Sequence, residues 1–96
     1  MKYTIDDIGG EIVKEDDRYV VKDNKSLNNL VLSSTDLKAT KCTNGHAHVG
    51  QEEVYLFMKG SGKIELIDFN GKHHDKNVKA NDVVLIPDGW FHRVHA

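Results

Sequence analysis

The feature that most constrains the fold of this chain is the shortness of its apolar runs and the density of turn residues between them. Val54–Met58 is followed by a glycine-rich turn, and Val83–Ile86 is followed by Pro87-Asp88-Gly89. Such short runs, bounded by glycine or proline, are typical of strands, because a globular helix needs about ten residues or more. Because neither run alternates with polar residues, both predict strands that are buried on their two faces.

Further strands are predicted from β-branched and aromatic residues, from alternation and from turn dipeptides such as Asn70-Gly71. They are Arg18–Lys22, one or two within Leu27–Leu37, Lys63–Asp68, His73–Lys79 and His92–His95. In Lys63–Asp68, Ile64 and Leu66 fall on one face. The helix signal is weak, because Gly9-Gly10 interrupts the one candidate, residues 6–14. The sequence predicts an all-β fold, a barrel or a sandwich, with little helix.

Length and composition predict a single domain of ordinary character. With 96 residues, of which 39% are hydrophobic and 29% charged, the chain suits one hydrophobic core. We therefore expect one domain over residues 1–96, with residues 1–17 as a less regular N-terminal arm.

Charge and cysteine usage exclude several classes of partner. The net charge is −2 and the lysines are interspersed with acids, which argues against binding to nucleic acid or to an anionic membrane. No apolar run reaches the length of a signal peptide or of a membrane span. Cys42 is the one cysteine, so an intramolecular disulfide is excluded. We expect a protein of the reducing cytoplasm.

The histidines indicate a metal site. His46 and His48 lie two positions apart, and in a strand they would project to the same face. Glu53 opens the apolar strand that follows, where a buried carboxylate requires compensation of its charge. Two imidazoles and a carboxylate are typical ligands of transition metals. The alternative is that His46-x-His48 is an ordinary pair of surface histidines.

Glu52 competes with Glu53 for the ligand role. Glu53 shares its face of the predicted strand with Tyr55 and Phe57, whereas Glu52 shares the face of Val54. This parity favours Glu53.

Four other residues could ligate a metal, and each has a simpler interpretation. His73 and His74 lie among charged residues and suit a solvated hairpin tip better than a second metal site. His95 alternates away from the expected ligand face and should point outward. Cys42 has the parity to look inward, where a small buried side chain is favoured over a soft outer ligand.

Two segments of the chain, Gly45–Gly60 and Asn81–His92, resemble the two conserved motifs of the cupin superfamily. The matching residues are His46, His48, Glu53 and Gly60 in the first motif, and Pro87, Gly89 and His92 in the second. In two places the chain departs from the pattern, since Thr40 and Asn81 stand where a glycine usually opens each motif. Ala96 also replaces the asparagine that often ends the second. Because asparagine tolerates left-handed backbone geometry, Asn81 need not disturb its turn.

The resemblance implies a cupin-type double-stranded β-helix barrel, which is jelly-roll-like, with one metal ion inside. It implies that His46, His48, Glu53 and His92 hold one divalent transition metal ion, which is Fe, Mn, Ni, Co or Zn. We expect a small-molecule ligand in a pocket formed by Tyr55, Phe57, Trp90, Phe91 and Val94. The simpler interpretation of the four aromatic residues, which is favoured, is that they serve only as core.

Three functions are compatible with such a site. The first is a metal-dependent enzyme that isomerises a sugar or sugar phosphate, and the similarity of residues 52–62 to small cupins grouped with sugar-phosphate isomerases favours it. The second is an Fe(II)-dependent dioxygenase of a small organic substrate. The third is a non-catalytic module that binds a metal or a small molecule. Outward-facing Val54, Leu56 and Met58 need cover, either from another sheet of the chain or from a second subunit, and we expect a homodimer.

Overall fold

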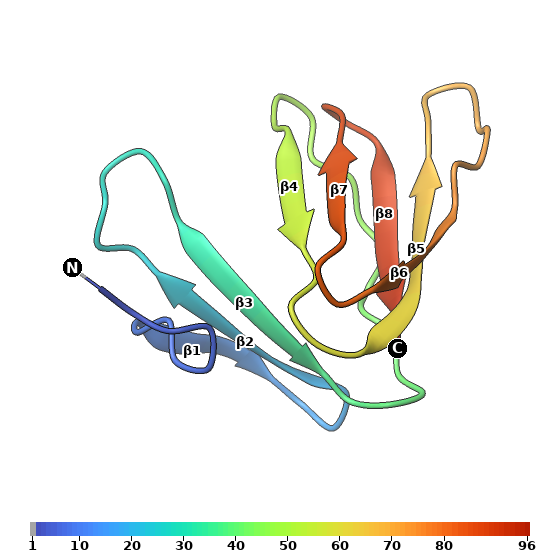
Figure 1. Ribbon diagram of the computed structural model, residues 1–96. Helices are drawn as coiled ribbons and strands as arrows, with labels where there is room; N and C mark the ends of the chain where they lie inside the picture. The colour runs from blue at the N-terminus through green and yellow to red at the C-terminus, as the bar shows by residue number, and fades with distance from the viewer. Residues whose placement is uncertain (1) are drawn as a thin grey trace. The chain divides into compact units, whose positions relative to one another are not determined.

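A computed structural model describes residues 2–96 and gives an all-β protein, with no helix among those residues. The eight strands are β1 (Glu11–Glu15), β2 (Tyr19–Asn24), β3 (Leu32–Leu37), β4 (Glu53–Leu56), β5 (Ser61–Ile67), β6 (Lys76–Lys79), β7 (Val83–Ile86) and β8 (Phe91–His95). They form three antiparallel sheets, in the orders β1-β2-β3, β4-β7 and β6-β5-β8 (Figure 1). The predicted all-β class is confirmed. None of the three sheets closes into a barrel, so the cupin-type barrel stays a prediction.

The chain divides into two compact units, with the boundary between Lys41 and Cys42. The first unit contains β1, β2 and β3, and the second contains the other five strands. The single domain that the length predicts is untested and stays a prediction. The expected N-terminal arm of residues 1–17 contains β1, and Met1 at its start lies outside the described residues.

The first unit is a three-stranded meander that begins after a pair of glycines. Both Gly9 and Gly10 have positive φ angles, of 73° and 81°, and this left-handed backbone is incompatible with a helix across residues 6–14. The chain instead enters β1, which pairs with β2 through a bulged register. Tyr19 is buried in this unit, and the buried amide of Asn24 donates a hydrogen bond of 2.7 Å to the carbonyl of Ile8.

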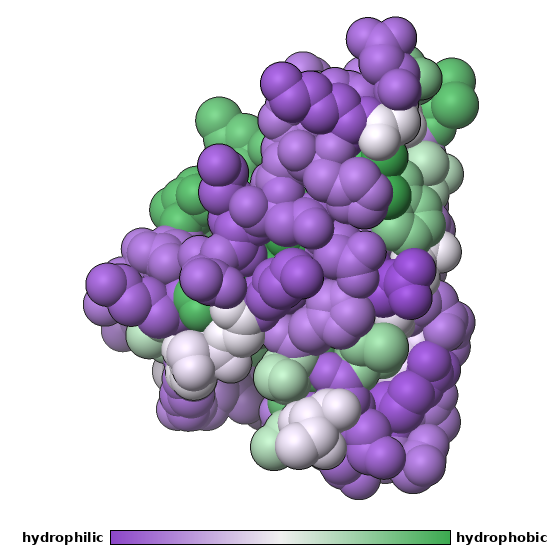
Figure 2. All heavy atoms as spheres, turned by 90° about the vertical axis from the view of Figure 1, so that its right-hand side faces the viewer, coloured by the Kyte–Doolittle hydropathy of each residue, from purple (hydrophilic) through white to green (hydrophobic). Residues whose placement is uncertain are grey.

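The second unit has its core on one face of the β6-β5-β8 sheet. Ile64 and Leu66 of β5, Val78 of β6 and Ile86 of β7 are all buried and form one cluster. The alternation predicted for residues 63–68 is confirmed, because Ile64 and Leu66 share this face while Lys63 and Glu65 do not. The side of the molecule drawn in Figure 2, on which β5 and β6 lie in Figure 1, is largely hydrophilic.

Within the second unit, β4 and β7 are covered on one face and not on both. Val54 and Leu56 are each 61% exposed, and their partners in the ladder, Leu85 and Val83, are 69% and 58% exposed. The alternate residues of the two strands face inward, and Tyr55 and Val84 pack against the core. The two apolar runs are continuous because their inward residues meet the core, while the residues between them form an exposed apolar face. Cover of that face by the partner of a homodimer stays a prediction.

The turns at the predicted motif positions share one backbone conformation. Thr40 and Asn81 have φ angles of 68° and 77°, and Gly60 and Gly89 both have 76°. The left-handed geometry expected of Asn81 is confirmed. Thr40 is β-branched, and a residue of this kind at positive φ carries strain of about 1–3 kcal/mol. The chain therefore has glycine-like backbone geometry at both positions where the cupin pattern usually has glycine.

Among residues 2–96, the structure has no helix long and apolar enough to cross a membrane.

Candidate metal centre

The site is built around one pair of opposed residues, His46 and His92. They form an isolated antiparallel bridge in which each amide donates to the other's carbonyl, at 3.1 and 2.9 Å. Residues opposed in this way project to the same side of the sheet. Their imidazole rings accordingly meet edge to face, with centroids 4.5 Å apart.

His48 joins this pair from a segment that is not a strand. The spacing of His46 and His48 favours a strand across residues 46–48, but only the bridge at His46 forms. The His48 carbonyl accepts a hydrogen bond of 3.1 Å from the Gly89 amide, and its ring centroid lies 4.7 Å from that of His46. One ligand nitrogen from each of His46, His48 and His92 lies within 4.8 Å of the others. The predicted gathering of these three histidines is confirmed, and we call them the histidine triad.

Hydrogen bonds set the tautomers of two members of the triad. The Nδ1 atom of His46 lies 3.2 Å from the Asn44 carbonyl, and Nδ1 of His92 lies 3.2 Å from the Trp90 carbonyl. Because a carbonyl can only accept, Nδ1 carries a proton in both rings, so in the neutral form of each ring Nε2 carries the lone pair. Metal-binding histidines in proteins are held in this manner.

In His92 the Nε2 atom is buried. The side chain of this residue is almost fully buried, and its Nε2 atom has no hydrogen-bond partner. A buried polar atom without a partner is destabilising, so such an atom calls for an explanation. A cation bound by Nε2 would satisfy it.

Glu53 lies beside the triad, as parity predicts. Its Oε2 atom is 3.0 Å from Nε2 of His92, although the two groups do not meet in hydrogen-bond geometry. With the neutral His92 ring carrying its proton on Nδ1, both atoms would bring lone pairs into a partly buried space, where a shared cation would relieve their repulsion. Glu53 is nevertheless not a member of the triad. Its neighbour Glu52 is exposed.

Electrostatics favour the neutral, metal-binding form of His46. Partial burial, and then the neighbouring rings of His92 and His48, lower its pKa below the ordinary value of 6.5. Tyr55 packs edge-on against His92 with ring centroids 5.6 Å apart. Burial and the charge of Glu53 raise the pKa of Tyr55 to about 12, so this phenol stays neutral.

The five residues of the predicted pocket occupy different surroundings. Tyr55 and Phe57 lie edge to face with centroids 6.3 Å apart, and together with Trp90 and Val94 they pack against the core. Phe91 lies against Gly45, at a place where a larger residue would collide with its ring. A shallow groove of ≈220 Å³ beside β4 and β7 includes Phe57, but none of the other four. A ligand pocket formed by these residues stays a prediction.

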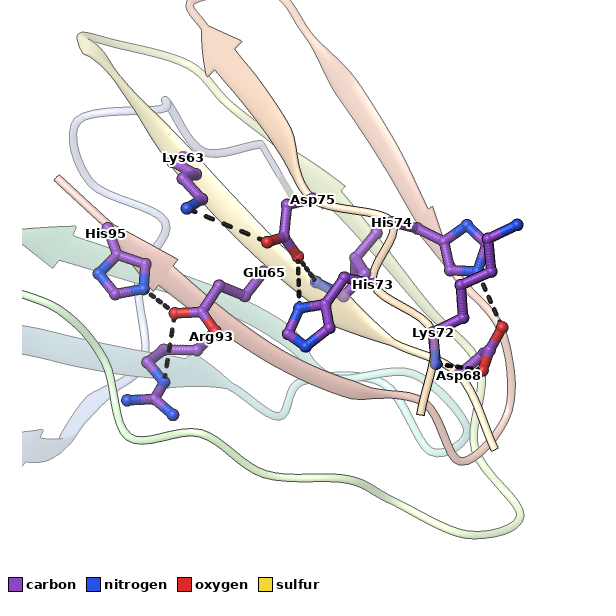
Figure 3. Close-up of polar contacts among 10 residues, drawn as sticks. Lys63, Glu65, Asp68, Lys72, His73, His74, Asp75, Arg93 and His95 are labelled. Atoms are coloured by element: carbon purple, nitrogen blue, oxygen red, sulfur yellow. Dashed lines mark hydrogen bonds and ion pairs between the residues drawn. The ribbon is translucent and has the colours of Figure 1, made fainter. Parts of the chain in front are cut away.

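The other three histidines each lie beside a carboxylate (Figure 3). His74 contacts Asp68 at 2.9 Å, His73 lies 3.5 Å from Asp75, and His95 contacts Glu65. The hydrogen bond from His74, with further ones from the Lys72 and Asn70 amides, lowers the pKa of Asp68. None of these histidines belongs to the triad or to another metal-holding group within residues 2–96.

Two contacts near the site had no counterpart in the sequence interpretation. The His74 ring stacks on Trp90 with centroids 4.8 Å apart, and the carboxylate of Asp88 accepts a hydrogen bond from the Gly50 amide. The turn signal Pro87-Asp88-Gly89 predicted the turn, but it did not predict a long-range partner for Asp88. Cys42 is half-buried and forms a bridge with His95, outside the triad.

No protein-family model, curated protein or solved structure matches this chain.

Proposed function

We propose that this chain is a small metal-binding protein of cupin type, which holds one divalent transition metal ion through His46, His48, His92 and Glu53. The observation that carries the proposal is the buried Nε2 atom of His92, which lacks a hydrogen-bond partner and lies next to two other imidazoles and a carboxylate. These donors match the borderline metals Fe, Mn, Ni, Co and Zn.

The backbone at the motif positions supports the cupin assignment. Thr40 and Asn81 adopt the left-handed conformation that a glycine would adopt without strain. The chain thus has, without glycine at either position, the backbone geometry that the turns of the two motifs would require. The hydrogen bond from the Gly89 amide to the His48 carbonyl also supports the assignment, because it joins the two motif segments.

The function that suits this centre is a reaction on a small oxygen-bearing molecule, and our first candidate is the isomerisation of a sugar or sugar phosphate. When bound, the metal ion would act as a Lewis acid that polarises a carbonyl or hydroxyl oxygen. His46 and His48 are exposed, so a small molecule can reach the centre from solvent. His92 and Glu53 hold its inner side, and the neutral Tyr55 beside His92 provides an apolar wall.

Metal titration of the untagged protein tests the binding part of this proposal. We expect one Co(II) or Zn(II) ion per chain by calorimetry and elemental analysis. Glu53→Gln should weaken binding by at least about tenfold, because it removes the negative charge beside His92; the loss should be smaller than for deletion of a ligand, since the amide keeps an oxygen donor. Glu52→Gln is the matched control and should bind like the wild type, because Glu52 is exposed. Wild-type protein without bound metal would contradict the proposal.

The reaction is tested separately, with the metal-loaded protein. Interconversion of aldose and ketose phosphates without oxygen uptake would support the isomerase assignment. Oxygen consumption that requires Fe(II) would assign a dioxygenase in its place. Tight binding of a small molecule without turnover by any metal form would leave a binding module.

A further inference from the structure

The segment that carries His48 has little packing to hold it in place. Val49, the next residue, is 91% exposed, and the backbone at Gly50 has a φ of 84° with open space around it. A loop with few buried contacts opens easily on its own. Yet a metal ligand must be held within about 0.5 Å of its productive position. Contacts other than core packing must therefore position His48.

Two hydrogen bonds join this segment to the turn that precedes His92. The Gly89 amide donates to the His48 carbonyl at 3.1 Å, and the Gly50 amide donates to the Asp88 carboxylate at 2.6 Å. The bond to Asp88 connects residues 38 positions apart and is the one of the two made by a side chain. A hydrogen bond to an ionised carboxylate is about twice as strong as a neutral one.

The turn itself does not need the Asp88 side chain. The Trp90 amide donates to the Pro87 carbonyl at 3.2 Å, and Gly89 supplies the positive φ, so backbone groups alone close the turn. The Asp88 side chain is exposed and contributes no core packing. Its one hydrogen bond within the described chain is directed at the loop that follows His48.

We propose that Asp88 is a positioning residue for the metal centre, which latches the loop at Gly50 and so holds His48 against His46 and His92. This inference rests on the proposed function, because it concerns the affinity of the same site. Without the latch, His48 samples positions outside the triad, and the metal ion loses one of its imidazoles for part of the time.

The test compares three variants by calorimetric titration with Co(II) and by the visible absorption of the bound ion. Asp88→Ala should weaken binding by about tenfold and alter the Co(II) spectrum, since removal of a group that orients a ligand costs about ten- to a hundredfold. Asp88→Asn keeps an acceptor oxygen and should recover most of the loss. Asp82→Ala is the matched control, because Asp82 accepts a similar 2.9 Å bond from the Lys79 amide in a turn away from the triad.

A double-mutant cycle separates positioning of His48 from a general effect on the fold. In a His48→Ala background, Asp88→Ala should cause no further loss of Co(II) affinity, because the residue it positions is absent. If Asp88→Ala binds Co(II) like the wild type, or adds its full effect to that of His48→Ala, this inference is overturned and the proposed function is not. If the wild type binds no metal, both are overturned.

Discussion

The six histidines of this chain form two groups of equal size and opposite character. His46, His48 and His92 lie against one another. His73, His74 and His95 lie apart from one another, each against its own carboxylate (Figure 3), whereas the three clustered rings have only Glu53, which lies beside His92. The same side chain therefore has two different environments within one small unit. The difference teaches that its neighbours decide what a histidine can do.

The two groups differ in how their neighbours affect protonation of the imidazole ring. A carboxylate beside an imidazole attracts the charge of the protonated ring, whereas another imidazole repels it. In the triad, burial and then this repulsion lower the pKa of His46, which favours the neutral ring with its lone pair available. A metal ion requires that state of its ligands. A cluster of three imidazoles with a single carboxylate therefore favours binding of a metal ion over protonation of the rings.

The largest expected effect is a loss of metal affinity, which should follow removal of a histidine from the triad and not removal of one from the other group. His92→Ala should weaken Co(II) or Zn(II) binding by more than about a hundredfold, because loss of a ligand should exceed the loss of a group that only orients one. His95→Ala should leave the affinity unchanged, since His95 pairs with Glu65 away from the triad. Calorimetric titration measures both, and circular dichroism of the metal-free variants controls for folding. Equal losses in the two variants would remove the distinction between the groups.

A smaller effect is expected within the carboxylate-paired group. His74→Ala removes the stack on Trp90 and the hydrogen bond to Asp68, and should lower the free energy of unfolding by about 1 kcal/mol. His73→Ala should change it little, because its pair with Asp75 is exposed to solvent. Denaturant unfolding followed by the fluorescence of Trp90, the one tryptophan, reports both. A His74→Ala variant as stable as the wild type would show that the stack contributes nothing.

The smallest expected effect is on the pH dependence of stability, in which the two groups of histidines should differ. The folded-state pKa of His46 lies below 6.5, so the unfolded chain takes up the proton first as the pH falls. The metal-free protein should therefore lose stability from about pH 6.5 downward until the folded-state pKa is passed. Asp68 has a folded-state pKa below its ordinary 3.8, so its contribution is present above that value and is lost only at lower pH.

Substitution of His46 tests this assignment of the pH window. His46→Gln should flatten the fall in the denaturation midpoint just below pH 6.5 and leave the acid limb at lower pH in place. An unchanged profile near pH 6.5 would show that His46 does not carry this dependence.

Much of the fold could be predicted because it depends on local patterns. The alternation in β5 placed Ile64 and Leu66 in the core, and the turn signals located the hairpin at Asn70-Gly71 and the turn at Pro87–Gly89. The number of covered faces of each strand could not be predicted in the same way. Whether an apolar strand such as β7 is covered on one face or on two depends on tertiary packing, which the sequence pattern of the strand does not contain.

The candidate site was predicted for a partly different reason from the one the structure gives. Strand parity predicts that His46 and His48 lie together, whereas the molecule positions them by one bridge to His92 and one hydrogen bond to Gly89. Asp88 and His74 were missed as neighbours of the site because their partners, Gly50 and Trp90, lie far away in the sequence. Spacing rules describe neighbours on one element, and neither contact is of that kind.

The most direct test of the two-group account is a long-range ¹H–¹⁵N NMR correlation of all six histidines during titration with Zn(II). We predict that the Nε2 resonances of His46 and His92, and one ring nitrogen of His48, move to metal-bound shifts at one equivalent. The resonances of His73, His74 and His95 should keep their metal-free shifts. Movement of the second group in place of the first, or no movement in either, would contradict the account.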